Sequence, residues 1–237
     1  MWDDAGAEGK EPPDGGGMAI MMKEKRTGNP DRKPHILLFI SALRRGGAER
    51  VMVNLAGYLK EQGMRVTVVT QYRCENEYEL PEGIPRILSE ITEEEKAGNR
   101  LSDLLARYRK LRGIWKEQRP DVILSFIGKN NIMAVWASLF TKIPVVVSVR
   151  GEPDSEYPSR AMRLLSRTLF ALSAGVILQT RGAMEFFPGY IRKKSVILKN
   201  PLNPAFVRPR YEGERDGRIL SVGRVDKNKN HEMILRA

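Results

Sequence analysis

Two adjacent glycines, Gly46 and Gly47, are the first residues whose type and spacing suggest chemistry. They separate a short apolar run from a segment with helical periodicity, so they are expected to form the turn between a strand and a helix. Glycine lets the backbone bend tightly and lets a ligand approach it closely. The free N–H groups and the positive dipole end of the following helix would attract phosphates, carboxylates or sugar hydroxyls. The pattern alone equally permits a turn that serves only packing.

Arg150 is the second candidate, because it directly follows the β-branched run Pro144–Val149. A guanidinium at the carboxyl end of a strand can hold a phosphate or a sugar hydroxyl through two hydrogen bonds. The alternative is an ion pair with Glu152, which would give Arg150 a structural role. Glu49, on the helix after the glycine turn, is interpreted as a partner of the helix dipole rather than a general base.

These residues must be positioned by alternating strands and helices. Short apolar runs alternate with segments of helical periodicity, which is typical of a parallel α/β sheet with helices on both faces. The predicted strands are His35–Ile40, Val66–Val69, Arg86–Leu88, Asp121–Ser125, Pro144–Val149, Gly175–Gln179 and Ser195–Leu198. The longer predicted helices are the segment from Val51 to Gly63, Arg100–Gln118, Gly128–Phe140 and Ser159–Leu172. Ligands of such sheets bind outside the carboxyl ends of the strands, which groups Gly46-Gly47, Phe126–Asn131 and Arg150–Glu152 around one crevice.

Composition and missing motifs exclude several classes of protein. The 237 residues carry a net charge of +11 and contain one cysteine and two histidines. A single cysteine rules out an internal disulfide framework, and these residues alone cannot make a protein zinc site. The glycine turn lacks both the third glycine of a dinucleotide fingerprint and a Walker lysine, which argues against an NAD or ATP site. No nucleic-acid motif accompanies the charge, and no apolar segment approaches the ~20 residues that span a bilayer.

The chain is expected to contain four parts. Residues 1–33 are rich in Gly, Pro and charged residues and are interpreted as a disordered extension or a non-native start. Residues 34–201 form the α/β domain, and the proline-rich segment 202–217 is a linker. Residues 218–237 begin a new unit with a predicted strand at Arg218–Val222 and a helix from Lys229. Because such a short piece cannot bury itself, this unit is interpreted as the start of a truncated second α/β domain.

Four segments, taken in order, carry a resemblance to a known family. They read HILLFISALRRGGAERVMVNLAGYLKEQGMRVTVVT, then PDVILSF with PVVVSVRGEP, then FFPGYIRKKSVILKNPLNP, and finally ILSVGRVDKNKNHEMILRA. Together they resemble retaining glycosyltransferases of family 4, which have the GT-B fold. The resemblance covers about His35 to Ala237.

The resemblance implies two facing Rossmann-like domains with the reaction between them. The first would take the acceptor, and the second would bind a nucleotide-sugar such as a UDP- or GDP-sugar as substrate. Arg224 and Lys229 match the basic pair that clamps the donor diphosphate in the family. Two cations and helix N–H groups can stabilise that leaving group, so no metal and no further cofactor are expected. The family also carries a pair of glutamates in the second domain, and this chain ends before any such pair, so transfer by the chain as given is in doubt.

The predicted activity is transfer of a hexose or N-acetylhexosamine, with retention, to a glycan or lipid-linked saccharide in bacterial polysaccharide synthesis. Two alternatives stay open: a sugar-nucleotide epimerase of the same fold, and a non-catalytic fragment that binds only the acceptor. The resemblance implies a cytoplasmic protein. The basic flanks of Arg100–Gln118 and Ser159–Leu172 add an expected attachment to an anionic membrane surface, while the apolar stripes of these helices are expected to face the core.

Overall fold

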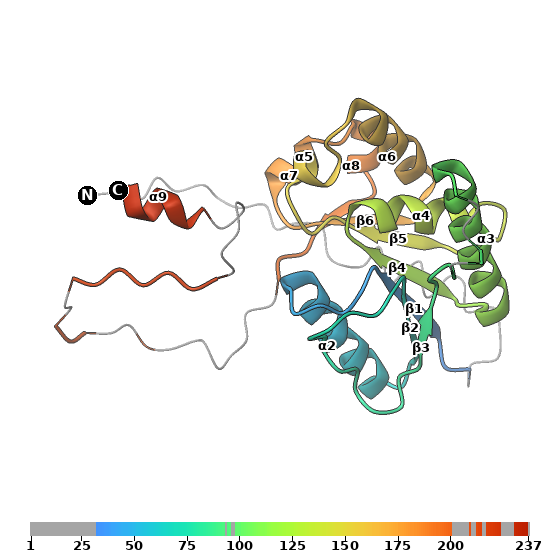
Figure 1. Cartoon of the computed structure of the whole chain (residues 1–237), viewed down its shortest axis with the longest axis horizontal. Coiled ribbons are helices and arrows are strands. Elements are labelled where there is room, and N and C mark those ends of the chain that lie inside the picture. The colour runs from blue at the N-terminus through green and yellow to red at the C-terminus, as the bar shows by residue number, and fades with distance from the viewer. Residues whose placement is uncertain are drawn as a thin grey trace. The chain divides into compact units, whose positions relative to one another are not determined.

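The computed structural model describes residues 32–92, 94–95, 98–200, 209, 212–214, 217–223 and 230–236. The chain divides into two compact units, Met1–Asn200 and Pro201–Ala237. In the described part of the first unit, helices surround one seven-stranded sheet (Figure 1). Most of the predicted extension 1–33 lies outside the described residues, as does most of the predicted linker 202–217.

The strands of the first unit are β1 (His35–Ile40), β2 (Arg65–Thr70), β3 (Arg86–Leu88), β4 (Val122–Phe126), β5 (Val145–Ser148), β6 (Gly175–Leu178) and β7 (Ser195–Ile197). Its helices are α2 (Gly47–Glu61), α3 (Arg100–Gln118), α4 (Gly128–Ser138), α5 (Pro153–Glu156), α6 (Arg160–Leu172), α7 (Arg181–Glu185) and α8 (Gly189–Arg192). The second unit contains α9 (His231–Arg236).

All seven strands run parallel, in the order β3-β2-β1-β4-β5-β6-β7. The chain builds the sheet outward from β1 to β3, returns through α3, and continues outward on the other side from β4. Strand β1 therefore pairs with β2 on one side and β4 on the other, with Ile36 opposite Val66 and Val122. This reversal of order between β1 and β4 opens a crevice at their carboxyl ends, which is where α/β sheets bind ligands.

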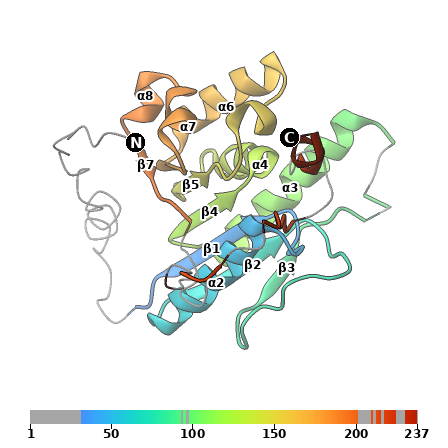
Figure 2. The ribbon, with the colours of Figure 1, turned by 90° about the vertical axis from the view of Figure 1, so that its left-hand side faces the viewer.

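Strand periodicity divides the core into two layers. On β1, Leu37 and Phe39 belong to the cluster that includes Trp115 of α3, while Ile36 and Leu38 belong to the cluster on the opposite face. Figure 2 shows α2 on that opposite face, and α3, α4, α6, α7 and α8 on the face of the first cluster. Because both faces are covered at the centre of the sheet, β1 and β4 are buried at every position, which is why they read as largely apolar runs, whereas the edge strands β3 and β7 are partly exposed.

The helix boundaries follow from capping. Helix α3 begins after Asn99, whose side chain accepts the Ser102 N–H at 2.8 Å, and α6 begins after Ser159, which accepts the Met162 N–H at 3.1 Å. Gly63, with φ of +79°, ends the turn that follows α2. Helix α3 has the predicted bounds, and α4 ends two residues before the predicted Phe140.

The predicted strand at Arg218–Val222 is wrong, because the structure shows irregular backbone there. Ile219, Leu220 and Val222 are each more than 80% exposed. The described residues of the second unit contain no strand to pair with this segment, and a strand has little stability without a neighbour. The predicted helix is present as α9.

Candidate functional site

Three of the predicted site segments follow three adjacent strands. The Gly46-Gly47 turn lies after β1, the 126–131 turn lies at the end of β4, and Arg150 follows β5. Since all strands are parallel, these segments lie at one edge of the sheet, beside the crevice between β1 and β4. The structure thus brings together the residues that the sequence grouped for the first unit. Arg224 and Lys229 lie outside the described residues.

The two glycines of the first turn have different surroundings. A Cβ atom on Gly46 would lie 2.3 Å from Oε2 of Glu49, so Gly46 leaves room for this carboxylate at the N-terminus of α2. A negative charge in the first turn of a helix stabilises it. A Cβ atom on Gly47 would meet nothing within 4 Å. Gly47 therefore borders open space in which a ligand could contact the backbone.

The side-chain amide of Asn130 forms a hydrogen-bond network at the base of the crevice. The Oδ1 atom of the buried Asn130, on α4, accepts hydrogen bonds from Nε2 of Gln71 at 3.0 Å and from the Ser41 hydroxyl at 3.1 Å. Its Nδ2 donates to the carbonyl of Phe126 at 3.0 Å. Asn130 thereby ties together the carboxyl ends of β1, β2 and β4. An open cavity of about 330 Å³ lies beside it, lined by Ser41, Ile127, Gly128, Lys129, Asn130, Ser155 and Glu156.

Ile127 is the strained residue of this crevice. Its φ of +73° is unusual for a β-branched side chain, because the Cβ substituents crowd the backbone in that region. After this strained turn, the first N–H group of α4, that of Gly128, donates to Glu156, which follows β5. Backbone strain of this kind persists only where surrounding contacts hold it, and it concentrates at functional sites.

The Arg150 side chain is held by an aromatic ring and by one amide. Its guanidinium lies 4.8 Å from the centre of the Phe126 ring, and it donates a hydrogen bond to Oδ1 of Asn200. The same oxygen accepts a hydrogen bond from Gln179 at 2.8 Å. Burial lowers the pKa of Arg150 from its ordinary value, although an arginine stays charged at neutral pH.

The alternative ion pair of Arg150 with Glu152 is absent from the described residues. The Arg150 side chain therefore presents a partly buried positive charge whose side-chain hydrogen bond goes to a neutral amide. An anionic or hydroxyl-rich ligand at the carboxyl edge of the sheet could complete its hydrogen bonds.

Sequence reasoning missed the polar residues that support the site. Gln71 follows β2 directly, Gln179 follows β6, and Asn200 lies shortly after β7. The rule that grouped the other segments could have found them, since each stands just beyond the carboxyl end of a strand. Asn130 was included only as part of the 126–131 turn, and its spacing within α4 gave no sign that it joins three strands.

A buried ion pair braces the loop that carries the glycine turn. Glu77 binds Arg86 through two hydrogen bonds of 2.5 and 3.1 Å, and it accepts the N–H groups of Leu43 and Cys74 at 3.3 and 3.1 Å. The two charged side chains are only 13% and 12% exposed. Hydrogen bonding from Arg86, followed by the contacts to Cys74 and Leu43, lowers the pKa of Glu77 to about 2. Cys74 serves this brace by donating its thiol hydrogen to Glu77 at 3.3 Å.

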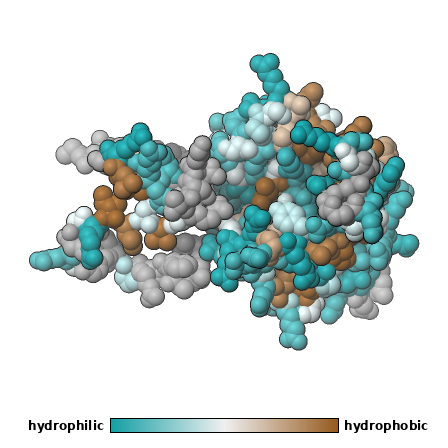
Figure 3. All heavy atoms as spheres, in the orientation of Figure 1, coloured by the Kyte–Doolittle hydropathy of each residue, from teal (hydrophilic) through white to brown (hydrophobic). Residues whose placement is uncertain are grey.

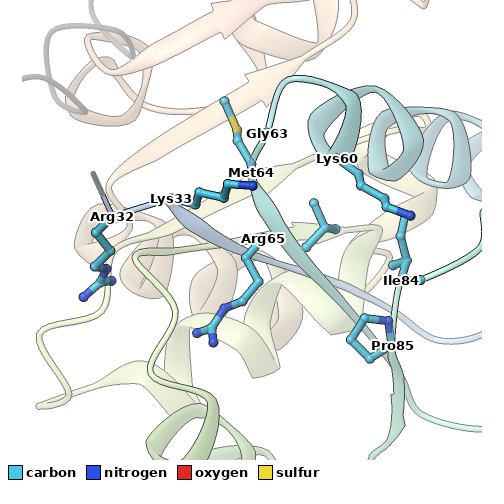
Figure 4. A pocket seen from close by; sticks show the side chains of 10 residues that line it. Arg32, Lys33, Lys60, Gly63, Met64, Arg65, Ile84 and Pro85 are labelled. Atoms are coloured by element: carbon cyan, nitrogen blue, oxygen red, sulfur yellow. The ribbon is translucent and has the colours of Figure 1, made fainter. Parts of the chain in front are cut away.

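A larger hollow, of about 650 Å³, lies at the opposite edge of the sheet (Figure 4). Three of its four basic lining residues are engaged elsewhere: Arg32 pairs with Asp121, Arg65 contacts His35, and Lys60 binds the Glu82 carbonyl. The C-terminal end of α2 also borders it, and that end of a helix disfavours anions. His35 belongs to this edge as a buried residue whose ring bonds the hydroxyl of Thr67 at 2.9 Å, which gives it a structural role. Burial of the His35 ring, followed by the positive charge of Arg65, lowers the pKa of His35.

Among the residues that the structure describes, no group of three or more His, Cys, Asp or Glu side chains could hold a metal ion. The groups that the crevice offers to a ligand are the backbone N–H groups at the N-terminus of α2, amides, hydroxyls and the Arg150 cation. Such groups bind phosphates and sugar hydroxyls by hydrogen bonding.

A doubly wound, all-parallel sheet with these groups at its crossover point defines a Rossmann-like binding domain. The chain belongs to the family of glycosyl transferase 4-like domains, whose sequence model matches residues 46–195. The fold agrees with the GT-B type of family 4 that the sequence resembles.

Two curated relatives from Campylobacter jejuni match most of the chain. One, 23% identical over 206 residues, is named GalNAc-alpha-(1->4)-GalNAc-alpha-(1->3)-diNAcBac-PP-undecaprenol alpha-1,4-N-acetyl-D-galactosaminyltransferase; the match covers 85% of this chain and 56% of the relative. The other is named N-acetylgalactosamine-N,N'-diacetylbacillosaminyl-diphospho-undecaprenol 4-alpha-N-acetylgalactosaminyltransferase, and is 26% identical over 84% of this chain and 58% of its own length. The chain thus spans little more than half the length of these relatives.

Solved structures support the fold. Anabaena HepE in complex with UDP and glucose superposes with a TM-score of 0.56 at 17% identity, over 72% of this chain and 45% of HepE. A glycosyltransferase from Rickettsia africae gives a TM-score of 0.52 at 17% identity, over 75% and 47% of the two chains. A UDP-N-acetylglucosamine 2-epimerase superposes with a TM-score of 0.50 at 14% identity, over 70% of this chain and 48% of the epimerase. At these identities, the likeness concerns the fold alone.

Proposed function

We propose that this chain provides the acceptor-binding part of a glycosyltransferase that adds a sugar to a lipid-linked saccharide. The observation that carries the proposal is the meeting of Gly47, the 126–131 turn and Arg150 at the carboxyl edge of three adjacent strands. Together they offer the backbone N–H groups at the N-terminus of α2 and one partly buried cation, which suit a diphosphate and the hydroxyls of a saccharide. Both Campylobacter relatives are named for diphospho-undecaprenol-linked acceptors, which supports this substrate class.

The finer mechanism is part of the same proposal. The donor is a UDP- or GDP-sugar, transfer proceeds with retention and without a metal, and Arg224 and Lys229 clamp the donor diphosphate. Gly46 and Gly47 contribute to the site through the N-terminus of α2, and Arg150 contacts the reacting acceptor. The chemistry supports this assignment, since cations and helix N–H groups stabilise the charge that grows on a diphosphate leaving group.

The proposal predicts that the chain binds a lipid diphosphate saccharide. The test is titration of the protein with detergent-solubilised GalNAc-diphospho-undecaprenol, with undecaprenol lacking the diphosphate as the matched control. Saturable binding of the first and weak binding of the second are expected. Equal binding of both would contradict the proposal, because the N–H groups and Arg150 would then contribute nothing.

A panel of nucleotide-sugars, assayed for nucleotide release with and without this acceptor, separates the alternatives. Release that depends on acceptor indicates transfer, whereas binding without release indicates an acceptor-binding module. Conversion of UDP-N-acetylhexosamine without acceptor would indicate an epimerase. In the first unit, His35 lies at the edge of the sheet away from the crevice and bonds Thr67, so it supplies no histidine to an epimerase site there.

The outer face of α6 suggests where the proposed enzyme meets its lipid acceptor. We expected the apolar stripe Leu164, Leu165, Phe170 and Leu172 of this helix to face the core, but only Phe170 of the four is buried, next to Leu169. The three leucines of the stripe are exposed by 69%, 47% and 62%, namely Leu164, Leu165 and Leu172. Figure 3 shows apolar patches among hydrophilic side chains on the side of the first unit where α6 lies. Exposed leucines beside arginines are typical of a helix that lies at a membrane surface.

Of the three arginines on α6, Arg160 is the best suited to a membrane test. Arg163 pairs with Asp154 at 2.8 Å and Arg167 binds the Phe186 carbonyl at 3.3 Å, so both also have structural contacts. Among the described residues, no helix combines the length and the apolar character needed to cross a bilayer. We propose peripheral attachment at the inner face of the cytoplasmic membrane, through the exposed leucines and the arginines of α6.

The chain is expected to sediment with vesicles of phosphatidylcholine mixed with phosphatidylglycerol, and much less with phosphatidylcholine alone. Each arginine near an anionic surface contributes about 1 kcal/mol, so Arg160→Gln should weaken binding about fivefold. The matched control is Arg50→Gln on α2, which covers the opposite face of the sheet. Added salt should weaken binding, because screening acts over about 8 Å at physiological ionic strength. Equal sedimentation with both kinds of vesicle would rule out the electrostatic attachment.

A further inference from the structure

Glu156, the last residue of α5, joins two turns of the candidate site. Its Oε2 accepts the N–H of Gly128, the first residue of α4, at 2.7 Å. Its Oε1 accepts the N–H groups of Arg150 and Gly151, at 2.9 and 2.6 Å. A single carboxylate therefore connects the turn after β4 with the turn after β5. It also places a negative charge at the N-terminus of α4, where the helix dipole favours it.

Glycines at two of the three donors allow this close contact. A Cβ atom on Gly128 would lie 3.2 Å from the backbone oxygen of Glu156, and a Cβ atom on Gly151 would lie 3.2 Å from its Oε1. Both distances are shorter than ordinary van der Waals contact. The sequence therefore supplies small residues where the carboxylate must approach the backbone.

The backbone of α5 is anchored on both sides of Glu156. Pro153 is buried, and Tyr157 is fully buried with its ring edge-on to Phe170 at 5.9 Å. Burial raises the pKa of Tyr157 well above its usual value, so this anchor stays neutral. Arg163 of α6 pairs with Asp154 and also donates to the Tyr157 carbonyl at 3.0 Å. Because α5 is fixed in this way, the carboxylate imposes its position on the turns that it binds.

We propose that Glu156 is a positioning residue that sets the backbone of Arg150 so that its guanidinium lies over Phe126 and faces the acceptor. The inference deepens the proposed function and rests on it for the identity of the ligand. A glutamate suits this role, because both of its carboxylate oxygens accept backbone N–H groups. The carboxylate accepts hydrogen bonds on both oxygens, whereas glutamine has one acceptor oxygen and would turn an NH₂ group toward a backbone donor.

The test compares Glu156→Gln with Glu152→Gln in the full chain. Both changes remove one negative charge next to Arg150, but Glu152 is exposed and its side chain does not cap α5. The first readout is the NMR signal of the Arg150 Nε–Hε group, assigned by its loss in Arg150→Lys. The Phe126 ring, 4.8 Å away, shifts this signal from that of an exposed arginine. The second readout is the affinity for farnesyl diphosphate.

Glu156→Gln should move the Arg150 signal toward that of exposed arginines and weaken farnesyl diphosphate binding about tenfold, the cost of a misplaced charged hydrogen bond. Glu152→Gln should change neither. If Glu156→Gln does not fold, Gly151→Ala provides the second variant, because its Cβ would press on Oε1 of Glu156 and should cause a smaller shift in the same direction.

An Arg150 signal unchanged in a folded Glu156→Gln protein would overturn the inference. If the unaltered chain does not bind farnesyl diphosphate, the proposed ligand class is wrong, and the Arg150 signal still decides whether Glu156 positions this arginine. The two readouts therefore separate a failure of the positioning role from a failure of the proposed function.

Discussion

Replacing Arg150 by glutamine is expected to weaken binding of GalNAc-diphospho-undecaprenol by about 10- to 100-fold, the effect of losing a hydrogen bond to a charged group. The guanidinium is partly withdrawn from water over the Phe126 ring, and its side-chain partner is the neutral amide of Asn200. A charge in such surroundings interacts more strongly with an incoming diphosphate than a solvated charge does. Arg150→Lys keeps the charge but loses the planar guanidinium that makes paired hydrogen bonds. Its affinity should therefore lie between those of the unaltered chain and Arg150→Gln.

Isothermal titration with the detergent-solubilised lipid measures this effect. The control is Arg107→Gln, which removes an exposed charge from α3 and should leave the affinity unchanged. Thermal unfolding of each variant shows whether the fold is intact. An Arg150→Gln protein that folds and binds like the unaltered chain would remove Arg150 from the site.

Replacing Glu77 by glutamine should lower the free energy of unfolding by about 3 kcal/mol at neutral pH, since its pKa falls from 4.5 to about 2 on folding. The variant also leaves the buried Arg86 without its ion-pair partner. The loop that carries the glycine turn should loosen as well, because Glu77 binds the Leu43 N–H. Urea unfolding at pH 7 measures the loss, with the exposed Glu75→Gln as the control in the same loop.

The same brace predicts a specific pH dependence. Because folding depresses the pKa of Glu77, its contribution to stability is complete above about pH 4.5 and is lost as the pH falls toward 2. The difference in unfolding free energy between the unaltered chain and Glu77→Gln should therefore shrink over this range. A difference that stays constant from pH 7 to pH 3 would show that the stabilisation does not come from the Glu77 charge.

Local patterns in the sequence determined the class of fold and the edge of the sheet that carries the site. Apolar runs predicted parallel strands, and all seven predicted before residue 201 are found as β1–β7, whereas the strand predicted at Arg218–Val222 is absent. The longer helices were recognisable because their apolar residues recur with helical spacing. The four-residue helices α5 and α8 were missed, since one turn is too short to show a period. The parallel topology then placed Gly47 and Arg150 at the same edge, because every strand ends there.

Only the tertiary structure decided what surrounds these residues. The Arg150 side chain donates a hydrogen bond to Asn200, which lies fifty positions later in the chain. Glu156 accepts one from Gly128, which lies twenty-eight positions earlier. Sequence reasoning offered Glu152 as the partner of Arg150 because it is near in the chain, whereas the carboxylate that holds this turn is Glu156. The physical reason is that strand and helix periodicity are local properties of the chain. The partners of a polar side chain depend on the order of strands in the sheet, because that order decides which distant segments of the chain lie next to each other.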